Sequence, residues 1–405
     1  MKFSRLYKAD MKREKIFVLC LLAAFCCSGI YAQKEENDFK LGAERMEKYL
    51  PLLEGKKVGI VANQTSVVRN SEGAYVHLLD TLLARGVNVV CVFSPEHGFR
   101  GNVEAGASVK SGKDLKTGVN VISLYGKNKK PSKEQVELCD IVLFDLQDVG
   151  CRFYTYISTL HYVMEACCEN NRPVIVLDRP NPNDFVDGPV LQSEYKSFVG
   201  MHCVPVVYGL TIGEYALMIN GEGWLKGKCH CDLTLVPLQA WFHDMEEVYR
   251  LPVAPSPNLP TTKAVALYPS LCLFEGTTVS VGRGTDRPFE IIGFPDYEDT
   301  AFCFIPRSIK GVSENPPYKN EKCYGRENLE IKERQLNLSF LTDMYSHCKN
   351  KDKFFNAFFD KLAGTNELKE QIKAHLDEEE IRKTWSKGLD EYKKIREKYV
   401  VYKRN

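Results

Sequence analysis

The chain has 405 residues, which is more than one ordinary hydrophobic core holds and fits two domains of about 100 to 200 residues each. Hydrophobic residues make up 44% and charged residues 26% of the sequence, as in globular proteins. The formal net charge of +1 provides no basic surplus and no acidic tail, so we expect neither a nucleic acid nor another polyanion as a partner.

The N-terminal segment has the pattern of a secretory signal. Lys12 and Lys15 precede an apolar run over residues 16–27, and Ala32 suits cleavage by signal peptidase. The run is too short to span a bilayer. The sequence therefore predicts a signal peptide over residues 1–32 and an exported protein, periplasmic or secreted. A cysteine pair at the end of the apolar run leaves a lipid-anchored form open.

Short apolar and β-branched runs alternate with helical stretches from residue 57 to about residue 237. Because nearly every residue in these runs is apolar, they are typical of a parallel sheet that helices cover on both faces. The predicted strands cover residues 58–62, 87–93, 119–124, 141–144 and 174–177. A helix is predicted over residues 75–85, and the capping pairs Ser132 with Gln135 and Thr211 with Glu214 predict the starts of two more.

Residues 255–260 contain three prolines, which keep the backbone extended and predict a connection between two domains. Beyond it the sequence predicts a strand over residues 277–281 and helices from Leu338 to the end. In the last helix, Trp385 and Leu389 begin an apolar stripe at helical spacing, which indicates a buried face.

The cysteine pattern does not fix any disulfide. Several of the 15 cysteines lie inside apolar runs, as Cys91 does, and are typical of small buried hydrophobic residues. Cys229 and Cys231 flank His230 like part of a metal site, but no second CxxC or HxxxH cluster completes a tetrahedral set. We therefore expect no metal. We also expect no nucleotide or other cofactor, because no glycine-rich phosphate-binding motif follows a predicted strand.

Polar, charged and aromatic residues follow four successive predicted strands. In open α/β sheets, ligands bind at the carboxyl ends of the strands, because the loops there converge where the strand order reverses. Ordinary turn chemistry explains the prolines and asparagines of these loops, but not the pair Glu96 and His97 or the cluster at 152–156. We therefore predict a ligand site. Its candidate residues are Glu96, His97, Tyr125, Asp145, Gln147, Asp148, Arg152, Tyr154, Tyr156, Asp178, Arg179 and Asn181.

These candidate residues are rich in carboxylates. Crowded carboxylates split their pKa values, so one can stay protonated as an acid while another stays charged, as glycoside hydrolysis requires. The tyrosines offer flat faces and hydroxyls to sugar rings. Arg152, Arg179 and Arg283 can grip a carboxylate bidentately, although pairing with the aspartates is the competing interpretation. No G-x-S-x-G pattern indicates a serine hydrolase.

The motifs that contain these residues resemble those of the NamZ-type exo-β-N-acetylmuramidases. The similar segments are 94–101, 144–150, 152–156, 178–182, 255–261, 268–269, 274–277 and 280–285, in the same order as in the family. The resemblance implies an α/β fold with a Rossmann-like domain over residues 33–256, a smaller α/β domain over residues 257–405, and an active site in the cleft between them. It also implies release of N-acetylmuramic acid from the non-reducing end of peptidoglycan-derived glycans, which contain N-acetylmuramic acid and N-acetylglucosamine.

The resemblance places the catalytic glutamate at Glu96. We expect Glu96 to act as the general acid, with His97 and Tyr125 fixing its environment. Asp148 or Asp145 is expected as the second carboxylate, unless the acetamido group of the substrate takes that role. Asn258 and Arg283 are expected to close the cleft over the sugar. Two other functions stay open: a metal-dependent amidase or deacetylase acting on cell-wall fragments, and a non-catalytic glycan-binding protein.

Overall fold

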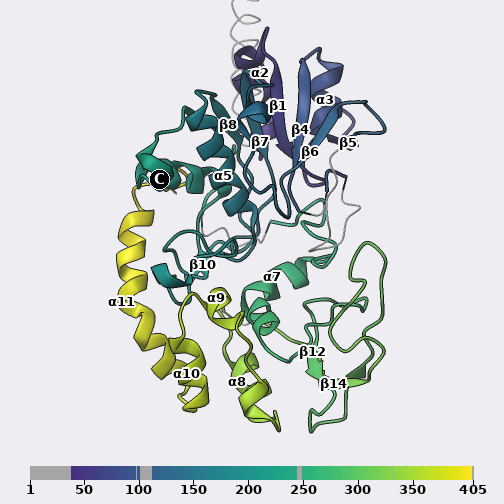
Figure 1. Cartoon of the computed structure of the whole chain (residues 1–405), viewed down its shortest axis with the longest axis vertical. Helices are drawn as coiled ribbons and strands as arrows, with labels where there is room; N and C mark the ends of the chain where they lie inside the picture. The colour runs from purple at the N-terminus through teal and green to yellow at the C-terminus, as the bar shows by residue number, and fades with distance from the viewer. Residues whose placement is uncertain (1–37, 97, 101–111, 244–248, 332, 404–405) are drawn as a thin grey trace, which may run out of the picture.

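The computed structural model describes residues 38–96, 98–100, 112–243, 249–331 and 333–403 (Figure 1). The predicted signal peptide and His97 lie outside the described residues. Within the described ranges, no helix is both long and apolar enough to cross a membrane.

A seven-stranded sheet forms the centre of the first half of the described chain. Neighbouring strands are parallel except at the edge, where β5 is antiparallel to β6. Across the sheet the strands are β11 (Leu233–Val236), β8 (Val174–Leu177), β7 (Ile141–Asp145), β1 (Val58–Ala62), β4 (Val89–Ser94), β6 (Asn120–Ser123) and β5 (Gly112–Lys113). This is the doubly wound order, which reverses between β1 and β7. The α/β prediction is confirmed, and the bounds of the five strands predicted between residues 58 and 177 lie within two residues of those of observed strands.

Alternate residues of the strands face two separate hydrophobic cores. Val61 and Phe93 belong to the core that includes α5 and α6, whereas Ile60 and Val92 belong to the core under α2 and α3. The two-residue period of a strand requires this division, and it explains why the sheet strands are apolar at nearly every position. The helices are α2 (Met46–Leu53), α3 (Leu78–Ala84), α4 (Lys133–Val136), α5 (Tyr156–Glu169) and α6 (Ile212–Gly221).

Both predicted capping boxes are present. The hydroxyl of Ser132 accepts from the Gln135 amide at the start of α4, and the hydroxyl of Thr211 accepts from the Glu214 amide at the start of α6. The prediction of a helix over residues 75–85 is wrong for its first three residues. Residues Tyr75–His77 form strand β3, which pairs with β2 (Val67–Arg69), and the helix begins after them.

The second half combines helices with a three-stranded antiparallel sheet. The strand predicted over residues 277–281 is wrong, because this segment makes only isolated bridges, such as Ser280 with Gly293. The sheet order is β12 (Ile292–Phe294), β14 (Cys323–Arg326) and β13 (Cys303–Phe304). The helices are α7 (Thr262–Leu271), α8 (Ser339–Ser346), α9 (Phe359–Ala363), α10 (Glu367–Lys373) and α11 (Glu378–Arg396).

Helix α11, yellow in Figure 1, runs along one side of the molecule from the second half back to the first. Its predicted buried face is confirmed, since Trp385, Leu389 and Tyr392 belong to the main core. Tyr392 also donates to the carbonyl of Tyr208 in β10 (Val207–Tyr208), which pairs with β9 (Val186–Asp187). The last helix therefore packs back against the first half of the chain, and it stabilises the loops at the ends of the parallel strands.

Candidate active site

A cavity of about 370 Å³ lies at the carboxyl edge of the large sheet. One side comes from the loops that follow β4, β6 and β7, as the topology of a doubly wound sheet predicts. The other side comes from residues 256–289, so both halves of the chain form the cavity. The candidate residues that line it are Glu96, Tyr125, Tyr154, Tyr156, Asn258 and Arg283.

Glu96 lies two residues beyond the end of β4 and is half-buried in the cavity wall. The hydroxyl of Thr155, at the start of α5, lies 3.4 Å from its Oε2 atom. Burial raises the pKa of Tyr154 and Tyr156, and the nearby charge of Glu96 raises both further. Both phenols therefore stay protonated beside the carboxylate.

Aromatic rings form a continuous wall beside Glu96. The ring of Tyr154 lies 4.7 Å from that of Tyr156 and 5.9 Å from that of Tyr268, measured between centroids. The Tyr154 hydroxyl donates to the carbonyl of Pro255 at 2.8 Å, and the Tyr156 hydroxyl accepts from Asn63 at 2.6 Å. These two hydroxyls hold the connection and the end of β1 in place, so their polar atoms are engaged within the protein.

The second half contributes an ion pair to the cavity. Arg283 Nε donates to Glu275 Oε1 at 2.5 Å, and both residues line the cavity. Glu275 was not among the predicted site residues, although it lies in the motif 274–277. The signal was the carboxylate within a segment of otherwise apolar and small residues.

Asn258 lies on the connection and is 1% exposed. Its Nδ2 atom donates to the carbonyl of Val312 at 2.8 Å, whereas its Oδ1 atom is buried without a hydrogen-bond partner in the described part of the chain. A buried acceptor left unpaired costs free energy unless a ligand or water uses it. Asn258 therefore places an unpaired buried acceptor in the wall of the cavity.

Asp148 is not among the described residues that line the cavity. Its Oδ2 atom accepts from the Gly150 amide at 2.7 Å and from the hydroxyl of Tyr208, in a fully buried position. Burial raises the pKa of Asp148 to about 7, although the two hydrogen bonds lower it. The expectation that its carboxylate projects into the crevice is therefore corrected, because the loop turns the side chain into the core.

Asp145 and Arg179 form a buried ion pair instead of facing the cavity. Arg179 donates through Nε and Nη2 to the two carboxylate oxygens, at 2.6 and 2.9 Å. Gln147, beside them, donates to the carbonyls of Asp148 and Pro180. The competing interpretation of the arginines, pairing with the aspartates, holds for Arg179.

The side chains of Arg152 and Asn181 also form hydrogen bonds with backbone groups. The guanidinium of Arg152 is fully buried and donates to four carbonyls, those of Pro189, Val204, Leu362 and Ala363. Asn181 donates to the carbonyl of Leu210 and accepts from the amide of Asn183. The expectation that both side chains bind a ligand is corrected, because both are buried and these backbone groups engage the two terminal nitrogens of Arg152 and both polar atoms of Asn181.

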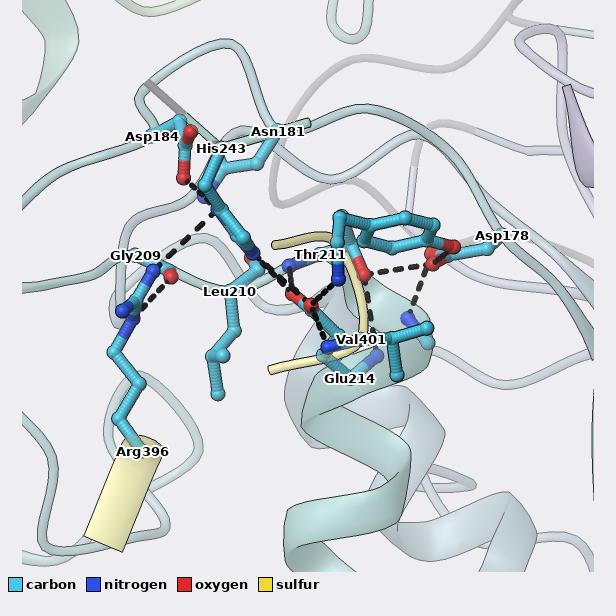
Figure 2. Close-up of polar contacts among 12 residues, drawn as sticks. Asp178, Asn181, Asp184, Gly209, Leu210, Thr211, Glu214, His243, Arg396 and Val401 are labelled. Atoms are coloured by element: carbon cyan, nitrogen blue, oxygen red, sulfur yellow. Dashed lines mark hydrogen bonds and ion pairs between the residues drawn. The ribbon is translucent and has the colours of Figure 1, made fainter. Parts of the chain in front are cut away.

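Asp178 belongs to a polar network that holds the C-terminal tail (Figure 2). Tyr402 donates to Asp178 at 2.5 Å, and Glu214 accepts from the amide of Val401 at 2.7 Å. Glu214 also lies 2.9 Å from His243 Nε2. Although burial disfavours the charged ring, hydrogen bonds to two carboxylates raise the pKa of His243 to about 9. Asp178 is therefore a tail-binding group, not a residue of the cavity.

Cys229 forms a disulfide with Cys168, 61 residues earlier in the chain. This bond removes one sulfur from the possible metal site around His230, and Cys231 is buried separately. No group of three potential ligands that could hold a metal ion occurs among the residues that the structure describes.

A doubly wound sheet with a carboxylate and an aromatic wall at its strand ends, and with a second region that completes the cavity, defines an α/β protein with a candidate active site between the two halves of the chain. Two family models match the chain: "Exo-beta-N-acetylmuramidase NamZ, N-terminal" over residues 58–263 and "Exo-beta-N-acetylmuramidase NamZ, C-terminal" over residues 266–402. The chain belongs to the NamZ family of exo-β-N-acetylmuramidases, as its motifs predicted.

Individual relatives agree with this assignment. The chain is 38% identical over 376 residues to the peptidoglycan beta-N-acetylmuramidase NamZ of Bacillus subtilis (strain 168), covering 87% of this chain and 89% of that protein. It is also similar to two crystal structures of DUF1343 family proteins from Bacteroides fragilis NCTC 9343. One has a TM-score of 0.82 and 44% identity, the other 0.75 and 31%, and each covers 91% of this chain and 100% of its own.

Proposed function

We propose that this protein is an exo-acting glycosidase that releases N-acetylmuramic acid from the non-reducing end of peptidoglycan-derived glycans. The observation that carries the proposal is the position of Glu96, which enters a cavity walled by aromatic rings in a chain of the NamZ family. Flat ring faces suit the apolar faces of a sugar, and a half-buried carboxyl group suits proton transfer to a glycosidic oxygen.

In this mechanism Glu96 is the general acid. Thr155 lies at its Oε2 atom, and the buried tyrosines beside it limit the access of water. Asn258 offers its unpaired Oδ1 atom to a hydroxyl or amide N–H of the sugar. Glu275 is the second described carboxylate in the cavity, but it is paired with Arg283, so we assign it to positioning that arginine. The acetamido group of the substrate then supplies the second function of the two-carboxylate scheme.

The test compares Glu96→Gln with the wild type on two substrates. One is the 4-nitrophenyl β-glycoside of N-acetylmuramic acid, and the other is its β-1,4-linked disaccharide with N-acetylglucosamine. We expect the variant to lose roughly 10²-fold to 10⁴-fold of kcat/KM on the disaccharide. The loss on the nitrophenyl glycoside should be smaller, because nitrophenolate leaves without needing a proton.

The matched control is Glu298→Gln, which removes an exposed carboxylate outside the cavity and should leave both rates unchanged. No release by the wild type would refute the proposed function. Equal losses on the two substrates would refute the acid role of Glu96 and leave the glycosidase assignment intact.

We also propose that the protein is exported, periplasmic or secreted, with residues 1–32 removed. The signal pattern supports this, as does the Cys168–Cys229 disulfide, since disulfides persist in oxidising compartments. Mass spectrometry of the protein from its native cell should find Gln33 as the first residue. A lipid on Cys26 or Cys27, or an intact N-terminus, would contradict this processing.

A further inference from the structure

The loop that carries Arg283 has a fixed backbone. Gly282 and Gly284 on either side of Arg283 have φ angles of 76° and 81°. A Cβ atom at Gly282 would lie 2.6 Å from Ile291, and one at Gly284 would lie 2.5 Å from the carbonyl oxygen of Arg307. These positions therefore require glycine for both their φ angles and their close packing. The result is that the Arg283 backbone has little freedom to move.

The side chain of Arg283 is fixed as well. Its guanidinium carbon lies 5.1 Å from the ring centroid of Phe289, and its Nε atom is bound to Glu275. Phe289 has a φ angle of 58°, which is uncommon for a bulky residue, and its amide donates to the carbonyl of Val281 at 2.7 Å. Strain of this kind persists where the surrounding structure holds it, often at ligand sites.

These contacts leave one edge of the guanidinium for a ligand. The ring of Phe289 covers one face of the guanidinium, and Glu275 accepts from its Nε atom. No acceptor in the described part of the chain engages the two Nη atoms. The side chain is 20% exposed and lines the cavity. A planar fork held in this way is preorganised to bind a carboxylate with two hydrogen bonds.

We infer that Arg283 binds the lactyl carboxylate of N-acetylmuramic acid and so selects this sugar over N-acetylglucosamine, with Glu275 as the positioning residue. The inference rests on the proposed function. The two sugars differ only in the 3-O-lactyl ether, whose carboxylate is the one charge on the muramic acid ring. A cation beside this group would distinguish the two sugars, because only one of them carries a carboxylate there.

Lys129 is the competing cation in the described wall of the cavity. Its ammonium lies 4.3 Å from the ring centroid of Phe198, on the side formed by the first half of the chain. An ammonium is a point charge on a flexible stem, so it binds a carboxylate without bidentate geometry. Arg283 is the better candidate, because the ring of Phe289, the ion pair with Glu275 and the two flanking glycines all fix its position.

The test measures kcat/KM on three 4-nitrophenyl β-glycosides: that of N-acetylmuramic acid, the methyl ester of its lactyl group, and that of N-acetylglucosamine. The variants are Arg283→Gln, Arg283→Lys, Glu275→Gln and Lys129→Met. The matched control is Arg287→Gln, which removes an arginine from the same segment and breaks its 2.7 Å surface ion pair with Glu327.

For the wild type we expect the free acid to be the best substrate. Arg283→Gln should lower kcat/KM on the free acid by on the order of 10²-fold, because a site built for a polar group loses most when that pairing fails. The ester and the N-acetylglucosamine glycoside should be hydrolysed at nearly the wild-type rate. The kcat/KM of Arg283→Lys on the free acid should lie between those of the wild type and Arg283→Gln. The kcat/KM of Arg287→Gln should match that of the wild type.

Glu275→Gln should reduce the preference for the free acid over the ester, mainly through KM, because the carboxylate orients Arg283. A purely structural role would lower all three rates together. Equal losses on all substrates in the Arg283 variants, or a preference that disappears with Lys129→Met instead, would overturn the inference. A wild type inactive on every glycoside would refute the proposed function itself, which distinguishes the two failures.

Discussion

Asp145, Asp148 and Asp178 follow buried strands, and the fold stabilises each carboxyl group differently. Asp145 forms a buried ion pair with Arg179. Burial raises the pKa of Asp178 to about 6 and that of Asp148 to about 7. A carboxyl group with a raised pKa holds its proton longer in the folded state than in the unfolded chain. Residues of this kind make the stability of the protein depend on pH.

Asp148→Asn should remove part of this pH dependence. The folded pKa of Asp148, about 7, lies above its ordinary value of 3.8, so the wild type should lose stability as the pH rises from about 4 to about 7. Each pKa unit corresponds to about 1.4 kcal/mol, so the difference in unfolding free energy between the two proteins should change by a few kcal/mol. Urea denaturation at pH 4.5, 6 and 7.5 measures this.

The side-chain amide that Asp148→Asn introduces has a carbonyl oxygen that can still accept from Gly150 and Tyr208, so the variant should fold. A constant difference between the two proteins across this pH range would contradict the raised pKa. A loss of activity comparable to that of Glu96→Gln would instead indicate that Asp148 takes part in the reaction, contrary to its buried position.

At the scale of elements, the C-terminal tail is bound to the end of β8 and to the first turn of α6. Tyr402 donates to Asp178, the residue that directly follows β8. Glu214 in α6 accepts from the amide of Val401 (Figure 2). The tail therefore stabilises the same sheet edge that carries the cavity. Its contacts explain why polar residues at this strand end are buried without contacting a ligand.

Tyr402→Phe tests how much the tail contributes. Removing a buried hydrogen bond to a carboxyl group should lower the unfolding free energy by about 1.5 to 3 kcal/mol. Tyr399→Phe is the matched control, because the Tyr399 hydroxyl donates to Glu222 at a partly exposed site and should matter less. Thermal and urea unfolding of both variants measure the difference. Equal losses would mean that the buried bond contributes no more than the surface one.

At the scale of the whole molecule, Arg152 joins the two halves of the chain. Its guanidinium donates to the carbonyls of Pro189 and Val204 in the first half and to those of Leu362 and Ala363 at the end of α9. Burial lowers its pKa to about 10, which still leaves it charged at neutral pH. A single buried cation therefore hydrogen-bonds to carbonyls from both halves of the chain.

Arg152→Met should lower the unfolding free energy by about 3 kcal/mol or more, since buried carbonyls lose their donors. Arg152→Lys keeps the charge but not the planar fork, and should recover part of the loss. Arg287→Gln, at the surface, should stay within about 0.5 kcal/mol of the wild type. Urea denaturation gives all three values. A wild-type stability for Arg152→Met would show that the halves do not depend on this contact.

Elements with local signals could be predicted from the sequence. Strands β1 and β8 have their predicted bounds, because a buried parallel strand is apolar at nearly every position. Capping boxes marked the starts of α4 and α6, because a cap lies within four residues of chain. The motifs also placed the chain in its family, and Glu96 at the strand end predicted where the cavity lies.

Which polar residues at the strand ends face the cavity could not be predicted from the sequence. Asp148, Arg152 and Asp178 have the same chemical character as groups that bind ligands, yet each meets a partner from a distant part of the chain. Those partners lie between 60 and 224 residues away in sequence. A local pattern shows which strand end carries a charge, but the choice between core and cavity depends on packing between remote segments.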